Sequence, residues 1–286
     1  MKPTWLRVRA PGRPAPLQQL LSSLKLATIC QSAHCPNLPT CWGEGTTTFL
    51  LLGEVCTRAC RFCAVKTGWP GRPPDPHEPE RVLQAVRALK LRHVVLTSVD
   101  RDDLPDGGAA QFAACIQLLR RELPQVSVEA LIPDFGGERE AIAAVVEANP
   151  QVIGHNLETV RRLTPQVRDW RAGYELSLEV LKTVKELAPQ MITKSSLLLG
   201  LGETEQEVKA AISDLREVGT DILVLGQYLR PSPAQLPVQR YLPPEEFARL
   251  ADWAKGIGFP VVVAGPLVRT SFRAAQALEA LRCGSS

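Results

Sequence analysis

The chain has 286 residues, of which 45% are hydrophobic and 22% are charged, and its formal net charge is +3. Such a length and hydrophobic content suffice for two small domains or one large α/β barrel-type domain, and they exclude long disordered stretches. The small net charge does not indicate nucleic-acid binding.

No apolar run approaches the roughly 18 residues of a membrane span. The first residues, MKPTWLRVRAPGRPAP, lack the apolar core of a secretory signal. We therefore expect a cytoplasmic protein with no membrane segment, in which clustered cysteines form metal or redox sites and not disulfides.

Charge is unevenly distributed along the chain. The first 43 residues contain five basic side chains and no acidic one: Lys2, Arg7, Arg9, Arg13 and Lys25. This basic arm could contact an acidic partner, although a solvated tail is the simpler interpretation.

Residues 1–48 predict an irregular extension with one amphipathic segment around LQQLLSSLKLA. Beyond it, short apolar runs alternate with helical periodicities. The runs indicate strands at 48–55, 93–99, 126–132, 151–156, 192–200, 221–227 and 260–265. The periodicities indicate helices at 78–90, 107–123, 138–148, 173–187, 204–218 and 243–257.

Repeated β-then-α units predict a parallel sheet in a full or partial (β/α) barrel. The proline-rich segment 68–80, GWPGRPPDPHEPE, is expected to be a loop. Thr204, three residues before Glu207, predicts a capping box at the start of a helix.

Six of the eight cysteines fall into two triplets with different spacings. The first, C-x4-C-x5-C, comprises Cys30, Cys35 and Cys41, and the second, C-x3-C-x2-C, comprises Cys56, Cys60 and Cys63. The second triplet directly follows the first expected strand, on the face where barrel enzymes carry their active sites. Three thiolates on a [4Fe–4S] cluster would leave one iron open, and radical chemistry on S-adenosylmethionine (SAM) uses such an iron.

Other interpretations of the cysteines stay open at this point. A structural zinc site could recruit His34 or His77, although such sites normally have four ligands in paired knuckles. Cys115 lies on the apolar face of an expected helix and is interpreted as a core residue, and Cys283 as incidental.

The stretch CTRACRFC, with Phe62 before its last cysteine, resembles the signature of radical SAM enzymes, and the upstream triplet resembles the auxiliary-cluster motif of the lipoyl synthase family. Further stretches similar to that family are LTSVDRDDLPDGGA, HNLETV, VLGQYLRPS, LPVQRYLPPEEF and AGPLVRTSF. The resemblance extends from Cys30 to Phe272.

This resemblance implies a partial (β/α)6-type TIM barrel of radical SAM type over residues 49–265. Residues 1–48 would be an N-terminal extension that carries the auxiliary motif. Residues 266–286 would be a C-terminal segment that supplies a serine ligand.

The resemblance also implies two [4Fe–4S] clusters and SAM as cofactors. Cys56, Cys60 and Cys63 would hold the cluster that binds and cleaves SAM to a 5′-deoxyadenosyl radical. Cys30, Cys35 and Cys41 would hold the auxiliary cluster that serves as the sulfur source.

Ser271 would be the fourth ligand of the auxiliary cluster, in a motif that reads Arg-Ser-Ser-Tyr in the family. Here Thr270 replaces the first serine and Phe272 replaces the tyrosine. A hydroxyl is a hard ligand beside soft thiolates, so its bond to iron should be the easiest to break. Without the resemblance, Ser271 would be interpreted as an ordinary loop or N-cap residue.

Candidate contacts to SAM follow three strands: Thr97, Ser98 and Asp100 after the second, Asn156 and Glu158 after the fourth, and Gly200 and Gly202 after the fifth. The two glycines could equally form a simple strand-ending turn.

Several other polar residues are interpreted without a role in chemistry. Asp102, Asp103, Glu205 and Glu207 are expected to be helix-start or surface acids. Gln235 stands where the family suggests a histidine, which leaves a role at that position open.

The implied reaction inserts sulfur at C6 and C8 of an octanoyl chain on a lysine of a lipoyl carrier domain, and it consumes two SAM. The implied carriers are lipoyl domains of 2-oxoacid dehydrogenase complexes or the glycine cleavage H protein. A ferredoxin or flavodoxin would supply electrons, and an iron–sulfur carrier would rebuild the auxiliary cluster. We expect a monomer because no exposed apolar stripe stands out.

Three alternatives remain at this stage: a biotin-synthase-like radical SAM enzyme, a non-catalytic iron–sulfur carrier, and a zinc-stabilised binding module. The upstream triplet argues against the first, because a biotin-synthase-like protein lacks it. A carrier would need neither seven strands nor an incompletely ligated iron.

Overall fold

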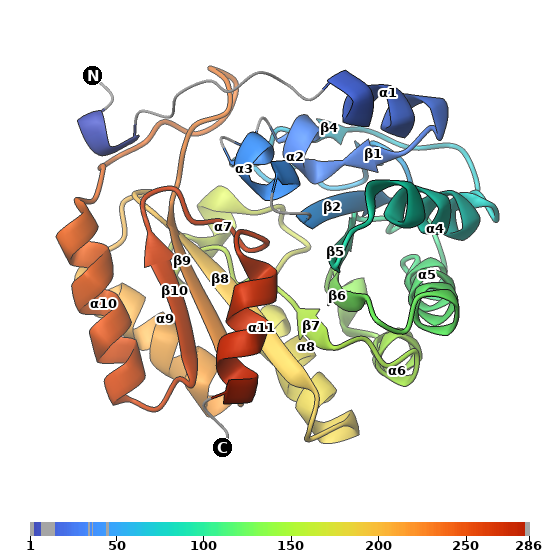
Figure 1. Cartoon of the computed structure of the whole chain (residues 1–286). Coiled ribbons are helices and arrows are strands. Elements are labelled where there is room, and N and C mark those ends of the chain that lie inside the picture. The colour runs from blue at the N-terminus through green and yellow to red at the C-terminus, as the bar shows by residue number, and fades with distance from the viewer. Residues whose placement is uncertain (1–2, 7–14, 34, 36, 44–45, 284–286) are drawn as a thin grey trace. The chain divides into compact units, whose positions relative to one another are not determined.

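The computed structural model describes residues 3–6, 15–33, 35, 37–43 and 46–283 (Figure 1). The chain divides into two compact units. We call Ala10–Ala59 with Ala64–Ile153 the N-terminal unit, and Met1–Arg9, Cys60–Cys63 and Gly154–Ser286 the C-terminal unit. No helix in the described part of the chain is long and apolar enough to cross a membrane.

The N-terminal unit contains a sheet in the order β1-β2-β5-β6, with β1 at Ala27–Thr28, β2 at Thr46–Leu51, β5 at His93–Ser98 and β6 at Ser127–Leu131. Strands β2, β5 and β6 are parallel, and β1 pairs antiparallel with β2. Register pairs Leu50 with Thr97 and Thr97 with Leu131, so the carboxyl ends of the three parallel strands are aligned.

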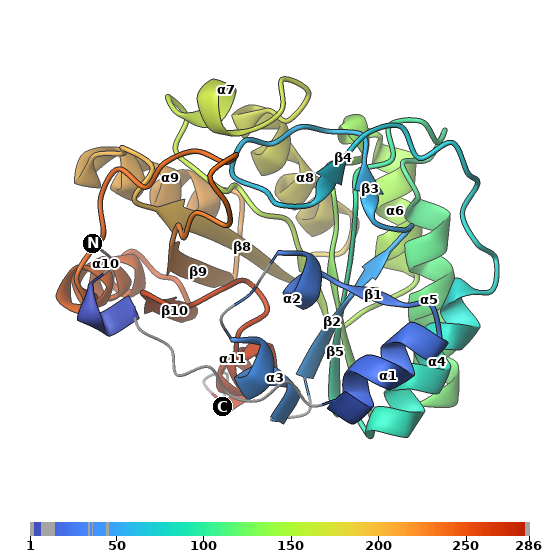
Figure 2. The same ribbon diagram turned by 90° about the horizontal axis from the view of Figure 1, so that it is seen from above.

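Three long helices cover one side of these strands (Figure 2). They are α4 at Glu78–Leu89, α5 at Ala109–Glu122 and α6 at Arg139–Glu147. Their apolar faces, with Val82 on α4 and Phe112 and Ile116 on α5, are fully buried. Cys115 is also buried, which confirms its interpretation as a core residue.

The shorter elements of this unit are α1 at Ala15–Ser23, α2 at Ile29–Ser32, α3 at Leu38–Gly43, β3 at Val55–Cys56, β4 at Lys66–Thr67 and η2 at Phe135–Gly137. β3 pairs with β4 in parallel. β7, Val152–Gly154, is the point where the chain passes into the C-terminal unit.

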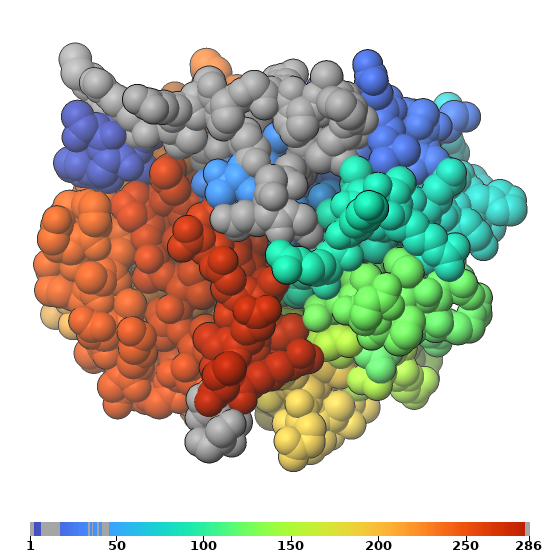
Figure 3. Space-filling model, viewed as in Figure 1, coloured from blue at the N-terminus to red at the C-terminus, as the bar shows by residue number. Residues whose placement is uncertain are grey.

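In the C-terminal unit, β8 (Ile192–Leu199), β9 (Ile222–Gln227) and β10 (Val261–Gly265) are parallel and adjacent in that order. The helices are η1 at Thr4–Leu6, α7 at Thr164–Val167, α8 at Tyr174–Leu187, α9 at Glu205–Glu217, α10 at Pro244–Gly256 and α11 at Ala274–Cys283. α10 packs against β10 and α9, and α11, red at the surface in Figure 3, packs against β10.

All seven expected strands and all six expected helices are present, with ends that differ by a few residues. The expected strand 48–55 is interrupted because the backbone turns at Leu52 and Gly53, both with positive φ. The capping box is confirmed: Thr204 Oγ1 accepts from the amide of Glu207, and Glu207 accepts from the amide of Thr204 at 2.8 Å.

The described part of residues 1–48 is more regular than the sequence indicates. The expected amphipathic segment is helix α1, and α2, α3 and β1 follow it. Elements of two to six residues are too short to show a periodicity, so sequence patterns do not reveal them. The division into segments 1–48, 49–265 and 266–286 stays a prediction.

A close backbone approach sets the path of the chain after β10. A Cβ atom on Gly226 of β9 would lie 2.2 Å from the carbonyl oxygen of Val268. Val268 is itself buried in an apolar cluster with Ile222 and Val224. The segment between β10 and α11 therefore lies directly on β9, and only glycine permits that contact.

Replacement of Gly226 by alanine should displace this segment or strain it. We expect a loss of about 1–3 kcal/mol of stability, as for other overpacked sites, and a melting temperature lower by several degrees. Differential scanning calorimetry measures the change. Gly256→Ala is the matched control, since a Cβ there meets nothing within 4 Å. Equal melting temperatures for the two variants would contradict the close-approach argument.

Candidate active site

Cys56 lies at the end of β3, beside the carboxyl end of β5. The amide of Thr57 donates to the carbonyl of Asp100 at 3.0 Å, and the amide of Gly68 donates to the carbonyl of Cys56 at 2.9 Å. Two further amides, of Arg58 and Asp100, donate to the sulfur of Cys56 at 3.4 Å each. Burial, and then the nearby charge of Asp100, raise the pKa of the Cys56 thiol to about 12.

Arg58 places a buried positive charge among three aspartates. Its guanidinium binds Asp134 at 2.5 and 2.7 Å and Asp102 at 2.7 Å, and it lies 3.5 Å from Asp100. Burial alone would lower the pKa of Arg58, but the hydrogen bonds to Asp134 and Asp102 raise it above the ordinary value. This charge cluster fixes the loop after Cys56 to the ends of β5 and β6.

Neither Asp102 nor Asp103 begins a helix; Asp102 is exposed, as expected of a surface acid, but both side chains form ion pairs. Asp102 binds Arg58 and accepts from the hydroxyl of Thr57 at 2.6 Å. Asp103 binds the buried Arg101 at 2.7 Å. The next helix, α5, begins only at Ala109. Sequence analysis missed Asp134 altogether, although it follows β6 closely, as Asp100 follows β5.

Thr97 and Ser98 form the carboxyl end of β5. Thr97 is buried between β2 and β6 in the sheet. The hydroxyl of Ser98 is buried and has no hydrogen-bond partner among the residues that the structure describes. A buried polar atom of this kind costs free energy unless a ligand satisfies it. It therefore fits a bound small molecule at the end of β5.

Two cysteines of the upstream triplet lie on short helices, and Cys35 lies between these helices in the sequence. Cys30 belongs to α2, which is capped by the hydroxyl of Thr28, and Cys41 belongs to α3. The amide of Cys35 donates to the carbonyl of Cys30 at 2.9 Å, and the amide of Cys41 to that of Asn37 at 2.9 Å. Burial, and then the charge of Cys35, raise the pKa of Cys30 to about 11.

The donor chemistry fits iron–sulfur clusters. None of the eight cysteines forms a disulfide, and Cys30 and Cys41 are buried. Thiols with raised pKa values are neutral in the free protein, and coordination to iron converts them to thiolates. In the described part of the chain, no three histidine, cysteine or acidic side chains are grouped so as to hold a metal ion. The fit to a cluster therefore concerns the kind of donor atom and not a preformed site.

Cys60 and Cys63 belong to the C-terminal unit, where backbone contacts hold the loop between them. The amide of Arg61 donates to the carbonyl of Val167 at 2.9 Å, and its own carbonyl accepts from the amide of Leu236 at 3.0 Å. The amide of Asp169 donates to the sulfur of Cys60 at 3.3 Å. Amide donors to a ligating sulfur tune the properties of a bound cluster.

Two aromatic side chains pack beside this loop. Phe62 packs against the main hydrophobic core of the C-terminal unit. The hydroxyl of Tyr228 donates to the carbonyl of Leu236 at 2.8 Å. Burial raises the pKa of Tyr228 to about 12, while Arg230 partly offsets the rise and the charge of Cys63 adds to it. The core thus supports the loop through the aromatic residue of the cysteine motif.

Asn156 and Glu158 follow β7 and lie next to Thr270. Asn156 Nδ2 donates to Glu158 at 2.9 Å and to the hydroxyl of Thr270 at 3.0 Å. Burial raises the pKa of Glu158, and Arg168 partly offsets the rise.

Ser271 is half-buried, and no described residue forms a hydrogen bond with its hydroxyl.

Gly200 and Gly202 form the turn after β8, with φ values of 101° and 111°. Gln227, which sequence analysis missed, is buried behind this turn and donates to the carbonyls of Leu199 and Arg240 at 2.9 and 3.0 Å. A polar residue that ends an otherwise apolar strand is the sequence signal that could have identified it. A Cβ on Gly200 would lie 2.2 Å from Gln227.

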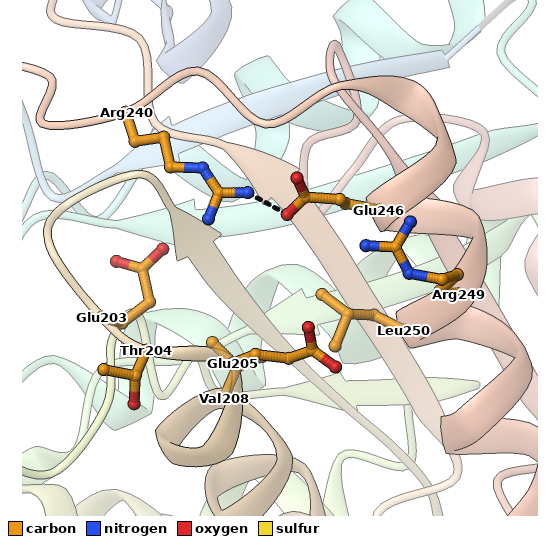
Figure 4. Close-up of a pocket in the computed structure, with 8 residues that line it drawn as sticks. All are labelled: Glu203, Thr204, Glu205, Val208, Arg240, Glu246, Arg249 and Leu250. Atoms are coloured by element: carbon orange, nitrogen blue, oxygen red, sulfur yellow. Dashed lines mark hydrogen bonds and ion pairs between the residues drawn. The ribbon is translucent and has the colours of Figure 1, made fainter.

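A small pocket opens beside this turn (Figure 4). It is lined by Glu203, Thr204, Glu205, Val208, Arg240, Glu246, Arg249 and Leu250. Arg240 and Glu246 form an ion pair across it. None of the site residues expected from the sequence lines the pocket.

Gln235, at the position where a histidine was expected, has a structural role. Its side-chain oxygen accepts from the hydroxyl of Ser232 at 2.7 Å, and its carbonyl accepts from Arg230 at 2.8 Å. These contacts shape the loop between β9 and α10.

Loss of the Arg58 charge should destabilise the protein strongly. Arg58→Gln leaves three carboxylates close together without their cation, and we expect a loss of about 3–5 kcal/mol in urea unfolding of the cluster-free protein. Arg121→Gln is the control, because Arg121 is 70% exposed and should change stability by less than about 0.5 kcal/mol. A similar unfolding midpoint for both variants would refute the role of the buried guanidinium.

Glu158 should make stability depend on pH. Its pKa is raised on folding, so ionisation opposes folding at high pH, and the penalty is absent below the ordinary glutamate pKa of about 4.3. Glu158→Gln should therefore raise the melting temperature at pH 8, with a difference that shrinks toward pH 5. Glu279→Gln, on the exposed side of α11, controls for the loss of a surface charge. A pH-independent difference would contradict this assignment.

Comparisons with known proteins agree with the sequence motifs. The pattern of the Radical SAM superfamily matches residues 50–215. The chain is 56% identical to a lipoyl synthase of Thermus thermophilus over 275 residues, which cover 96% of this chain and 85% of that protein. It is 57% identical to a lipoyl synthase of Pyrobaculum calidifontis over 285 residues, which cover 98% of this chain and 97% of that protein.

Among solved structures, the FeFe-hydrogenase maturase HydG from Carboxydothermus hydrogenoformans is similar with a TM-score of 0.62 at 10% identity. The similarity covers 93% of this chain and 69% of that chain, and at this identity it concerns the fold alone. The expected fold class, an α/β partial barrel of radical SAM type, is confirmed. The comparisons favour a lipoyl synthase over the biotin-synthase-like, carrier and zinc alternatives.

Proposed function

Because the chain belongs to the lipoyl synthase family of radical SAM enzymes, we propose that its two cysteine triplets are the two cluster sites of a sulfur-inserting reaction. The reaction places sulfur at C6 and C8 of an octanoyl group carried on a lysine of a lipoyl domain. The observation that carries the assignment is the presence of both triplets, with no cysteine in a disulfide, in a chain with this identity to lipoyl synthases.

Cys56, Cys60 and Cys63 are the proposed ligands of the [4Fe–4S] cluster that binds SAM. When bound, this cofactor pair supplies a radical able to remove hydrogen from an unactivated carbon, which no side-chain acid, base or nucleophile can do. The side chains and backbone amides of the protein would contribute by holding the ligand cysteines in place. Arg58 and its aspartates hold the Cys56 side of the loop, and the amide of Asp169 donates to Cys60.

Ser98 and Asp100 are the best-supported contacts to SAM. The Ser98 hydroxyl is buried and unsatisfied, and an amino or carboxylate group could satisfy it. Asp100 lies 3.5 Å from the sulfur of Cys56, so its carboxylate would face a positively charged ligand group near that cluster. Thr97 lies one residue before Ser98 on the same strand end.

The remaining proposed contacts to SAM lie in the C-terminal unit. Gly200 and Gly202 leave backbone exposed without side chains, which suits close approach of an adenosine group. Glu158 offers a carboxylate to ribose hydroxyls, whereas the amide group of Asn156 is already engaged by Glu158 and Thr270.

Cys30, Cys35, Cys41 and Ser271 are the proposed ligands of the auxiliary cluster, which serves as the sulfur source. Three thiolates are soft ligands and bind iron firmly, while the Ser271 oxygen is a hard ligand and is released more easily. The Ser271 hydroxyl is compatible with this role, because ligation would not require a hydrogen bond to any described residue to break.

The proposed partners follow from the reaction. They are octanoylated lipoyl domains of 2-oxoacid dehydrogenase complexes or the glycine cleavage H protein, a ferredoxin or flavodoxin as reductant, and an iron–sulfur carrier for repair. We propose a cytoplasmic monomer. The basic arm, Lys2 to Lys25, lies largely outside the described residues, and its proposed role is to speed association with an acidic carrier domain.

Two triple variants separate the roles of the cysteine triplets. Replacement of the whole second triplet by alanine, at Cys56, Cys60 and Cys63, should abolish 5′-deoxyadenosine formation from SAM and dithionite. The corresponding replacement of Cys30, Cys35 and Cys41 should leave 5′-deoxyadenosine formation measurable but abolish sulfur transfer to an octanoyl-lysine peptide. Liquid chromatography with mass spectrometry follows both products. Sulfur transfer by the second variant would show that the sulfur source is elsewhere.

Ser271→Ala should retain 5′-deoxyadenosine formation and lose at least about tenfold in sulfur insertion, because one auxiliary iron then lacks its protein ligand. Ser271→Cys is the matched variant, since a thiolate can replace the oxygen as a ligand. It should retain iron but release it more slowly during turnover. Unimpaired sulfur insertion by Ser271→Ala would mean that Ser271 is not a ligand.

A further inference from the structure

The hydroxyl of Thr270 lies between two segments that precede it by many residues in the chain. The side-chain amide of Asn156, 114 residues away, donates to Thr270 Oγ1 at 3.0 Å. The hydroxyl of Ser196 on β8 lies 3.0 Å from the same oxygen, and either group can donate. Thr270 Oγ1 thus links the segment after β10 both to the segment after β7 and to β8.

The segment that carries Asn156 is itself firmly attached to β8. The amide of Glu158 donates to the carbonyl of Ser196 at 2.9 Å, and the amide of Leu198 donates to the carbonyl of Glu158 at 2.8 Å. Glu158 has a φ of 68°, a conformation that a non-glycine residue adopts only when its surroundings impose it. Asn156 also holds the Glu158 carboxylate at 2.9 Å. The partners of Thr270 therefore form a rigid support.

The rest of the turn leaves the side chain of Ser271 unrestrained. The carbonyl of Ser271 accepts from the amide of Ala274 at 3.4 Å, and the amide of Phe272 donates to the carbonyl of Arg269 at 2.9 Å. Phe272 packs against the apolar cluster around Val268 and cannot form a side-chain hydrogen bond. Thr270 consequently supplies the nearest polar side-chain anchor beside Ser271.

We propose that Thr270 is a positioning residue for Ser271, which it holds through the hydrogen bonds of its hydroxyl to Asn156 and Ser196. The proposal rests on the proposed function, in which Ser271 is an iron ligand. Because the anchor does not use the Ser271 hydroxyl, that hydroxyl can bind or leave iron while the turn keeps its conformation. Asn156 and Ser196 would then help to position Ser271 by holding Thr270, without themselves contacting the cluster.

The anchor itself is tested in the cluster-free protein by hydrogen exchange. Thr270→Val keeps the shape of the side chain and removes the hydroxyl, and Thr270→Ser keeps the hydroxyl as the matched control. The amides of Val268 and Phe272 should exchange roughly tenfold faster in Thr270→Val, as expected for the loss of two hydrogen bonds, and at the unchanged rate in Thr270→Ser. Ser196→Ala, which removes one of the two partners, should show a smaller acceleration and serves as the second variant should Thr270→Val fail to fold.

The effect on Ser271 is tested by Mössbauer spectroscopy of the auxiliary cluster alone. The background protein has Cys56, Cys60 and Cys63 replaced by alanine and is loaded with iron-57. Thr270→Val should shift the spectrum toward that of Ser271→Ala, whereas Thr270→Ser should retain the original spectrum. An original spectrum for Thr270→Val, or unchanged amide exchange, would overturn the positioning role.

Failure of the underlying ligand assignment gives a different result. If Ser271→Ala itself has the original spectrum, Ser271 is not a ligand, and the proposal falls together with that assignment. If Ser271→Ala changes the spectrum and Thr270→Val does not, the ligand assignment stands and only the positioning role is overturned.

Discussion

The buried guanidinium of Arg58 is the interaction on which the cysteine loop of the N-terminal unit depends. Asp100, Asp102 and Asp134 come from the carboxyl ends of two neighbouring strands, and their charges would repel one another without a cation between them. Arg58 lies two residues after Cys56, so the same charge cluster that neutralises the aspartates also fixes the start of the loop. Parallel register then determines where that loop lies, because β2, β5 and β6 end together.

The second half of the loop is held by different means. Cys60 to Cys63 belong to the C-terminal unit, where backbone hydrogen bonds from Arg61 and the burial of Phe62 fix the chain. The Cys56 end of the loop is therefore held by charge, and the Cys60–Cys63 end by backbone hydrogen bonds and apolar packing. These two kinds of interaction respond to different changes in solution conditions. The charge cluster depends mainly on pH, because protonation of the aspartates would remove its ion pairs, whereas the strength of apolar packing depends on temperature.

The chemistry of the family explains why such firm positioning is needed. An unactivated C–H bond yields only to a radical, and the resulting carbon radical must meet sulfur before it meets solvent. Radical formation requires a cluster whose ligands hold it permanently. Sulfur donation requires a second cluster with at least one ligand that can be released. In the proposed assignment, cysteine thiols, of which Cys30 and Cys56 have raised pKa values, and the hydroxyl of the half-buried Ser271 would provide the two kinds of ligand.

The sequence predicted the parallel architecture well, because strands such as β5 and β9 are continuous apolar runs that are buried along almost their whole length. It also located both cysteine triplets, whose spacing is visible without any structure. The sequence could not reveal that Asp134 and Asp102 both bind Arg58. In a sequence, an aspartate that follows a strand cannot be distinguished from an aspartate that merely forms a turn. The contact between Asn156 and Thr270 could not be predicted for a related reason. The two residues are 114 positions apart in the sequence, and no local sequence pattern indicates such a long-range pairing. Helices α2 and α3 were missed because they are too short for a periodicity.

The most direct test of the account follows the sulfur atoms through one turnover. Protein whose clusters are rebuilt with a heavy sulfur isotope and then freed of excess sulfide is mixed anaerobically with SAM, dithionite, an octanoyl-lysine peptide and ordinary sulfide. If the auxiliary cluster is the sulfur source, the peptide should gain two heavy sulfur atoms and 5′-deoxyadenosine should form, as measured by mass spectrometry. Ordinary sulfur in the product, or 5′-deoxyadenosine with no sulfur on the peptide, would contradict it.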